Sequence, residues 1–331
     1  MPRLGTEDTK EWLGYIRFLS RDGKGTIDIS NRCATLQPRY LDLGGTTKTR
    51  DSGQAGVHGE GLKIALLVLM RGPQNHNIRC RSGGFNWNFN FTTRGRLVAR
   101  LHRMSPESIQ KAKEQSRQQK EKTLLPLAVE PARDVQFVIG EQYKGRDESG
   151  NMVKQIPVLR EEFDEWTKAA LFLHKAGDEG IVSTPHGDLL AHPELRGTIY
   201  LKGLLLSEST PGNSASITKL PLKFGYNFAE GNTNRERQSV ASANKESRAI
   251  LAIWSRVLFV RPPMVQELSS MLNDTEIEYA DVFGAKRGMD LETESCLTEY
   301  LLGEEFAGKW YYCSEDKAKV RGDIQGLFWR H

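Results

Sequence analysis

The sequence has few cysteines and no long apolar run. Its four cysteines are scattered and form no C-x-x-C pair, which argues against a zinc site or a redox motif. The longest apolar run, Ile64–Met70, is far shorter than the ~18 residues that a bilayer-spanning helix needs. The first residues, M-P-R-L-G-T-E-D, lack the apolar core of a secretion signal. We therefore expect buried free thiols, a cytoplasmic or nuclear protein, and no membrane partner.

Charge is unevenly distributed between the two halves. Residues 1–150 carry 25 lysines and arginines against 16 acidic residues, whereas residues 151–331 carry 21 against 26. A basic first half suits a polyanion such as a nucleotide phosphate chain or a nucleic acid, and it is equally compatible with a solvated basic face. Arg94, Arg96, Arg100 and Arg103 lack the interleaved aromatic residues of a stacking platform. A nucleic-acid partner is thus not favoured.

The length of 331 residues suggests two domains. The polar, glycine-containing segment 144–151 precedes a new amphipathic helix predicted over Arg160–His174, so we divide the chain into 1–158 and 159–331. In the first part, the spacing of Trp12, Leu13 and Ile16 predicts a short helix over Glu7–Ser20. The alternation around Ile27 and Ile29 predicts a strand over 26–30.

An aromatic stripe marks the next pair of strands. Phe85, Trp87, Phe89 and Phe91 alternate with asparagines, which predicts a half-buried strand paired with 77–81 across a glycine turn. Ser105, followed by proline and glutamate, is typical of a helix start and opens a polar helical insertion over 105–122. The first domain should therefore be an α/β sandwich with a mixed, mostly antiparallel sheet.

The second domain should be a smaller α+β unit. Several strands are expected within 180–207 and near 222–228, followed by helices over 239–260, 263–272 and 294–301.

A cluster of glycines precedes the apolar helix expected over Leu62–Met70. Backbone N–H groups at a helix start are unsatisfied and carry partial positive charge, and glycines allow an anion to approach them closely. Gly56, Gly59 and Gly61 thus form a candidate anion seat, to which Lys63 and Lys48 add charge. The alternative is a tight turn whose glycines serve packing. The run contains no Walker motif and does not follow a strand directly.

The run 41–71, which contains L-D-L-G-G-T-T-K and G-V-H-G-E-G-L-K, resembles the GHKL superfamily. This group includes DNA gyrase, the ninety-kilodalton heat-shock chaperone, histidine kinases and MutL, and its ATPase domain has the Bergerat fold. One branch has a glycine motif G-x-x-G-E-G-x-K that caps a helix and binds the ATP phosphates behind a mobile lid. The resemblance implies that the protein binds ATP and Mg²⁺. The residues that line the phosphates would be Gly56, His58, Gly59, Glu60, Gly61, Leu62 and Lys63, and the lid would contain Thr46, Thr47 and Lys48.

The second half adds a weaker likeness. Residues 195–206, 224–228 and 234–237 resemble the domain that follows the ATPase fold in this branch, where an arginine-containing loop reaches the terminal phosphate. By that resemblance Arg235 and Arg237 are candidate phosphate sensors, because a guanidinium can fork onto a phosphate. An ion-pair cluster with Glu236 is the alternative.

Three features of the family are missing from the pattern. The family has an early helix with a catalytic Glu and a Mg²⁺-binding Asn, but the segment with Glu7, Asp8 and Glu11 has no Asn before Asn31. The Asp-x-Gly-x-Gly that reads adenine has lost its glycines, and Asp28 or Asn31 is at most a remnant of it. About 25 residues precede the first expected strand, too few for the usual front half. The sequence therefore predicts either an N-terminally shortened or a degenerate relative.

Two functions follow from this interpretation. The first is an ATP-binding GHKL-type protein, which is an ATPase only if the missing Glu and Asn are supplied. The second is a non-catalytic interaction module, or pseudo-ATPase, whose partner is another protein. The sequence identifies no catalytic residue and no metal ligand.

Overall fold

The computed structural model describes residues 3–4, 11–41, 61–73, 75–140, 156–174, 180–206, 215–231, 242–285 and 288–303. The chain divides into two compact units, Met1–Thr167 and Lys168–His331. The division falls near residue 167 rather than 158, so the first unit also contains the helix that begins at Arg160. Each unit has its own sheet and helices, which confirms a mixed α/β protein.

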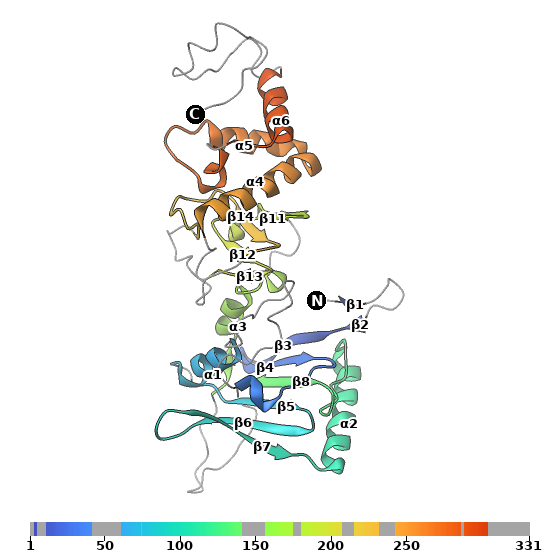
Figure 1. Cartoon of the computed structure of the whole chain (residues 1–331). Coiled ribbons are helices and arrows are strands. Elements are labelled where there is room, and N and C mark those ends of the chain that lie inside the picture. Colours follow the sequence, from blue (N-terminus) through green and yellow to red (C-terminus); the bar gives the residue numbers. More distant parts are fainter. Residues whose placement is uncertain are drawn as a thin grey trace. The chain divides into compact units, whose positions relative to one another are not determined.

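The first unit is built on a seven-stranded sheet whose pairings are all antiparallel. In Figure 1 its main strands stack in the order β3, β4, β8, β5, β6, β7. Their bounds are Gly14–Arg21 (β3), Lys24–Asn31 (β4), Val135–Ile139 (β8), Ile78–Ser82 (β5), Phe85–Phe91 (β6) and Leu97–Arg103 (β7). Strand β9 (Val158–Leu159) pairs with the start of β4, and β1 (Arg3–Leu4) pairs with β2 (Glu11–Trp12) in a separate ribbon.

The helix predicted over Glu7–Ser20 is wrong for the part that is described, because residues 11–12 and 14–21 are strands. Asp22 and Gly23 join β3 to β4 with φ values of 53° and 74°. Two positive φ angles suit the tight turn of a β-hairpin, and Asp-Gly is the sequence that adopts it. Ile16 and Phe18 then alternate with Tyr15 and Arg17 across the sheet. A few apolar residues in this segment have helical spacing, but the Asp22-Gly23 turn favours a pair of strands instead.

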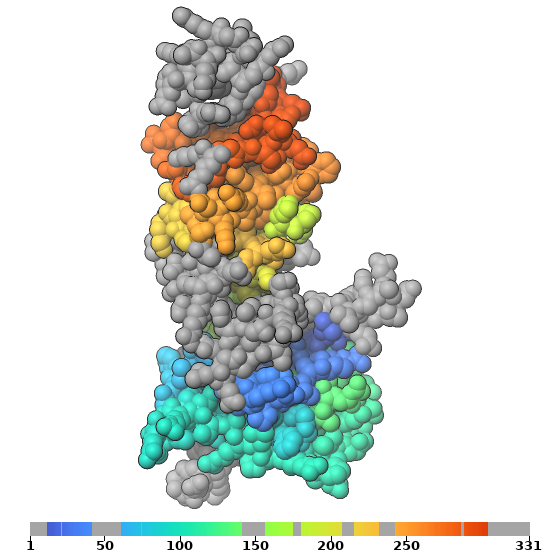
Figure 2. Space-filling model, viewed as in Figure 1, coloured from blue at the N-terminus to red at the C-terminus, as the bar shows by residue number. Residues whose placement is uncertain are grey.

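One face of the first sheet is apolar. Ile27, Cys80, Trp87 and Phe89 are buried there, together with Leu66 of helix α1 (Gly61–Arg71). Phe163 and Trp166 of helix α3 (Arg160–Thr167) pack against the same cluster. The predicted aromatic stripe of β6 is thus confirmed as core. Strand β7 lies at the sheet edge, where its second half is exposed (Figure 2).

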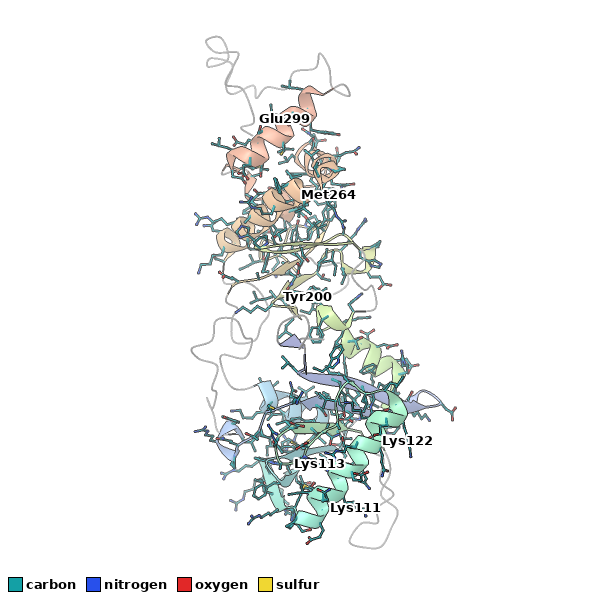
Figure 3. All side chains as sticks on the ribbon, turned by 90° about the vertical axis from the view of Figure 1, so that its right-hand side faces the viewer. Lys111, Lys113, Lys122, Tyr200, Met264 and Glu299 are labelled. Carbon is teal, nitrogen blue, oxygen red and sulfur yellow. The ribbon has the colours of Figure 1, made fainter. Side chains whose placement is uncertain are left out.

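The opposite face is polar, and helix α2 (Pro106–Thr123) lies against it. Ser105 caps the helix by accepting a hydrogen bond from the Ser108 N–H at 3.2 Å, as its sequence predicts. The Ser116 hydroxyl accepts a bond from the Val129 N–H at 2.6 Å, and Lys113 pairs with Glu130 at 2.9 Å. Figure 3 labels Lys111, Lys113 and Lys122 along helix α2. The predicted polar insertion is therefore helical and is held by side-chain contacts.

The second unit has a five-stranded sheet in the order β10-β11-β14-β12-β13, with a parallel pairing between β12 and β14 and antiparallel pairings elsewhere. The strands are Ile181–Thr184 (β10), Gly187–Leu190 (β11), Gly225–Phe228 (β14), Ile199–Leu201 (β12) and Leu204–Leu205 (β13). Helices α4 (Ala243–Val260), α5 (Val265–Leu272) and α6 (Leu291–Leu302) contribute to the apolar core that packs on this sheet (Figure 1). Short 3₁₀ turns lie at 38–41, 171–173, 193–195, 262–264 and 280–282. Of the helices described in either unit, none has the length and apolar character to cross a membrane.

Candidate functional site

The anion seat predicted from the glycines lies only partly within the described residues. Gly61, Leu62 and Lys63 are described, and they form the first turn of α1. The other predicted site residues lie outside the described part of the chain: Thr46, Thr47, Lys48, Gly56, His58, Gly59, Glu60, Arg235 and Arg237. The described part of α1 thus begins at Gly61, next to the predicted start at Leu62.

The first turn of α1 is exposed at its glycine and anchored by the residue that follows. Gly61 is exposed, and a Cβ placed on it would meet no heavy atom of the described residues within 4 Å. Leu62 packs with the apolar cluster on the sheet, and Leu66 one turn later is 1% exposed. The first described turn of α1 is therefore fixed on the sheet, while no described atom lies close to the Cβ position of Gly61.

The end of α1 is fixed to α3 through His76. The His76 N–H donates to the Leu69 carbonyl at 2.8 Å, which returns the chain onto the helix. The His76 ring Nε2 lies 3.0 Å from a carboxylate oxygen of Glu162, and the ring meets Trp166 edge-on. Since both ends of α1 have tertiary contacts, the helix position is set by the fold of the first unit.

Asp28 lies on the opposite face of the sheet from α1. Its neighbours Ile27 and Ile29 belong to the apolar cluster that contains Leu66, so the Asp28 side chain points to the polar face. Its carboxylate accepts hydrogen bonds from the Tyr15 hydroxyl at 3.0 Å and from Arg17 at 3.1 Å. Asp28 and α1 thus lie on opposite faces of the sheet, an arrangement that does not support the prediction that Asp28 is a remnant of an adenine-reading acid beside that helix.

Two further groups complete the Asp28 network. Gln136 Nε2 donates to the carboxylate at 3.0 Å, and the Ser30 hydroxyl donates to it at 3.4 Å. Burial, and then the adjacent Asp28 charge, raise the pKa of Tyr15 to about 12. The Tyr15 hydroxyl therefore stays protonated at neutral pH and acts as a donor.

A cavity of about 490 Å³ opens on this polar face. Its ionisable side chains are those of Arg17, Arg79, Arg81, Asp28 and His102. The rest of its lining, mostly polar, consists of Leu19, Thr26, Cys80, Asn86, Asn88, Gln119, Gln136 and Val138. Partial burial, with the neighbouring Arg79 charge second, lowers the pKa of Arg81. Partial burial and a neighbouring like charge both disfavour the charged form of Arg81, so an anion beside it would stabilise that form.

A smaller cavity of about 230 Å³ lies near the end of α2, beside Cys33 and Arg133. Cys33 is exposed, which corrects the expectation that this thiol is buried, whereas Cys80 is buried as expected. The Cys33 N–H donates to Asp134 at 2.9 Å, and an Arg133 nitrogen lies 4.0 Å from the sulfur. Its lining contains three basic side chains, Arg32, Lys120 and Arg133, and two acidic ones, Glu130 and Asp134, so its positive charge is nearly balanced.

The second unit contains a buried acid in a different setting. Asp281 accepts hydrogen bonds from the Tyr226 hydroxyl at 2.5 Å and from the Lys223 and Phe224 N–H groups at 2.9 and 3.3 Å. Trp254 donates to the Tyr226 oxygen at 2.9 Å. Burial raises the pKa of Asp281. These groups satisfy one another within the core, so they stabilise the fold and present no free donor to a ligand.

The residues around the larger cavity were not singled out as a site from the sequence. Arg79 and Arg81 alternate with apolar residues in β5, and Asn86 and Asn88 do so in β6. This period of two shows that they share a face, but a polar sheet face is ordinarily solvated. Only the placement of α2 shows that this face is partly covered.

The described residues contain no group of three His, Cys, Asp or Glu side chains arranged to hold a metal ion. No known protein family matches the chain, and no curated protein matches its sequence.

Proposed function

We propose that the first unit binds the phosphate chain of ATP at the start of α1, on a GHKL-type scaffold of the Bergerat kind. The observation that carries this proposal is the first turn of α1. Gly61 is exposed and has no described atom near its Cβ position, and the described part of the helix that it begins is fixed to the sheet by Leu62 and Leu66. Unsatisfied N–H groups at such a position favour an anion.

The resemblance of residues 56–63 to the family's phosphate motif supports the choice of nucleotide. Under this proposal Gly61 lets the phosphate approach the backbone, and Lys63 adds charge from the same helical turn. Mg²⁺ would neutralise phosphate charge, but no described side chain is assigned to it. Hydrolysis is not part of the proposal, because residues 11–21 are strands and provide no helix for a catalytic Glu.

A non-catalytic interaction module is the second candidate. The outer side of α1 favours it, since Ile64, Leu67 and Val68 are 52%, 43% and 60% exposed. Apolar side chains that gather on one exposed helix face are typical of a protein contact. This candidate requires no nucleotide, so the two functions differ in whether ATP stabilises the protein.

The test is a thermal shift with ATP and Mg²⁺ on the full chain. We expect millimolar ATP to raise the melting temperature of the wild type and Gly61→Ala to abolish the shift. The added Cβ meets no atom of the described residues and tilts towards the helix start, where it would occupy the proposed phosphate position. The control is Val68→Ala, an exposed change further along the same helix that should preserve the shift.

The unliganded melting temperature of Gly61→Ala should equal or slightly exceed that of the wild type, because alanine favours a helix more than glycine does. No shift of the wild type at millimolar ATP would refute nucleotide binding and favour the interaction module. A shift that survives in Gly61→Ala would place the nucleotide elsewhere.

A further inference from the structure

The cavity on the polar face of the first sheet has more positive than negative charge. Arg17, Arg79 and Arg81 line it, and Asp28 is the single acid among its lining residues. Arg17 is already engaged, since its Nη2 lies 3.1 Å from the Asp28 carboxylate. Two guanidinium groups, those of Arg79 and Arg81, therefore remain without a countercharge in the described lining.

Two donors in this cavity are buried without acceptors. The Nε atoms of Arg17 and Arg79 are inaccessible, and no described group accepts a hydrogen bond from either. Buried polar groups in folded proteins are normally hydrogen-bonded, and each exception calls for a cause. Neither the Arg79 nor the Arg81 side chain makes a hydrogen bond or an ion pair with another described residue. An anion between the Arg79 and Arg81 guanidinium groups would supply the negative charge that this part of the cavity lacks.

The geometry of the donors indicates the class of anion. Guanidinium groups present a planar fork that matches the oxygens of phosphate. Around them, the amides of Asn86, Asn88 and Gln119 can bind hydroxyl groups. The cavity volume of about 490 Å³ lies in the range of small-molecule sites.

The lining residues argue against a nucleic-acid strand. They include no phenylalanine, tyrosine or tryptophan, so bases would find no stacking surface. The aromatic residues Trp87 and Phe89 of β6 lie in the core on the other side of the sheet. A hydroxylated ligand that carries one phosphate group fits these observations better than an oligonucleotide.

We propose that this cavity binds a small phosphorylated, hydroxyl-bearing molecule, with Arg79 and Arg81 on the phosphate and the asparagine and glutamine amides on the hydroxyl groups. The site is independent of the nucleotide seat at α1, because the two lie on opposite faces of the sheet. The carboxy-terminal half of α2 borders the cavity through Gln119, and Thr123 of the same helix accepts a hydrogen bond from Arg17 at 3.3 Å.

The experiment is calorimetric titration of the full chain with inorganic phosphate and with ribose 5-phosphate. Both should bind, and ribose 5-phosphate should bind more tightly because it also engages the amides. Arg79→Gln should weaken the binding of both at least tenfold, whereas Arg79→Lys, which keeps the charge but loses the fork, should give an intermediate loss. The melting temperature of each variant shows whether it is folded, and Arg79→Lys carries the test if Arg79→Gln is not.

Arg100→Gln is the matched control. Arg100 is opposite Asn88 in the β6–β7 pairing and is therefore on the same face, but it does not line the cavity. Its substitution should change either affinity less than twofold. An equal loss in Arg100→Gln and Arg79→Gln would show diffuse surface attraction and overturn the proposal.

Two other outcomes would also overturn it. One is no binding of phosphate or ribose 5-phosphate at millimolar concentration. The other is binding of a single-stranded oligonucleotide that ribose 5-phosphate does not displace, which would identify a nucleic-acid surface. The Gly61→Ala variant should bind ribose 5-phosphate as the wild type does, so failure of the ATP experiment leaves this test unaffected.

Discussion

Each unit contains a buried acid within a hydrogen-bond network, but the two networks differ in whether every buried donor has an acceptor. Asp281 accepts hydrogen bonds from two backbone N–H groups and from the Tyr226 hydroxyl, whose oxygen in turn accepts a hydrogen bond from Trp254. Asp28 accepts hydrogen bonds from four donors. However, the buried Nε–H groups of Arg17, beside it, and of Arg79, in the same cavity, have no acceptor among the described residues.

The difference indicates separate roles. A complete network lowers the free energy of the folded state and offers nothing to a ligand. An incomplete network beside a cavity keeps donors and charge available, so part of its binding capacity is realised only when an anion is present. The Asp281 network should therefore govern the stability of the second unit, and the polar face of the first unit should govern ligand binding.

The largest expected effect is on the stability of the second unit. Asp281→Ala removes the acceptor of two backbone N–H groups and of the Tyr226 hydroxyl. Leaving buried donors unsatisfied costs about 1–3 kcal/mol each, so the free energy of unfolding should fall by roughly 4 kcal/mol. Denaturant unfolding followed by tryptophan fluorescence measures it.

Asp274→Ala provides the comparison for that measurement. Asp274 also accepts two backbone N–H groups, from Glu276 and Ile277, but in an exposed turn where water can replace it. Its loss should cost less than about 1 kcal/mol. Equal effects of the two substitutions would show that the Asp281 network is not specially important.

A smaller loss is expected at the acid of the first unit. Asp28→Asn removes the ion pair with Arg17 but keeps an oxygen for the Tyr15 hydroxyl, and should lower the free energy of unfolding by about 1–2 kcal/mol. Because the substitution removes the single acid of the cavity lining, it should also strengthen phosphate binding about threefold. Weaker phosphate binding in Asp28→Asn would contradict the account of the charge in the cavity.

The smallest expected effect is a change in the titration of Tyr15. Its pKa is raised from 10.0 to about 12 by burial first and by Asp28 second. A folded-state pKa above the unfolded value stabilises the fold below pH 10 and loses that contribution as pH rises through about 12. Asp28→Asn should lower the Tyr15 pKa while burial keeps it above 10.0.

Ultraviolet difference titration of the wild type, Asp28→Asn and Tyr15→Phe isolates this hydroxyl from the other tyrosines. An unchanged Tyr15 transition in Asp28→Asn would mean that the carboxylate does not act on it.

The sequence predicted elements where local signals were strong. The β5–β6 hairpin follows from the aromatic alternation and the two glycines at 83 and 84, and the start of α2 follows from Ser105. Residues 11–21 were misassigned because a few apolar residues fit both periods, and the Asp22-Gly23 turn decides between them.

The site could be predicted only in part. The start of α1 could be predicted because the residues that form it are contiguous in the sequence. The cavity was not, since Arg17 and Arg79 are far apart in sequence and come together through the β3-β4-β8-β5 strand order. Polar alternation in β5 and β6 also looks the same whether that face is solvated or covered, and α2 alone makes the difference.

The most direct test of the central claim is nuclear magnetic resonance of the arginine Nε–H groups during a titration with ribose 5-phosphate. The account predicts that the Arg79 Nε–H resonance shifts saturably and exchanges more slowly with water, while the Arg100 resonance stays unchanged. An Arg79 resonance that does not respond, or an Arg100 resonance that responds equally, would contradict a phosphate site on the polar face of the first unit.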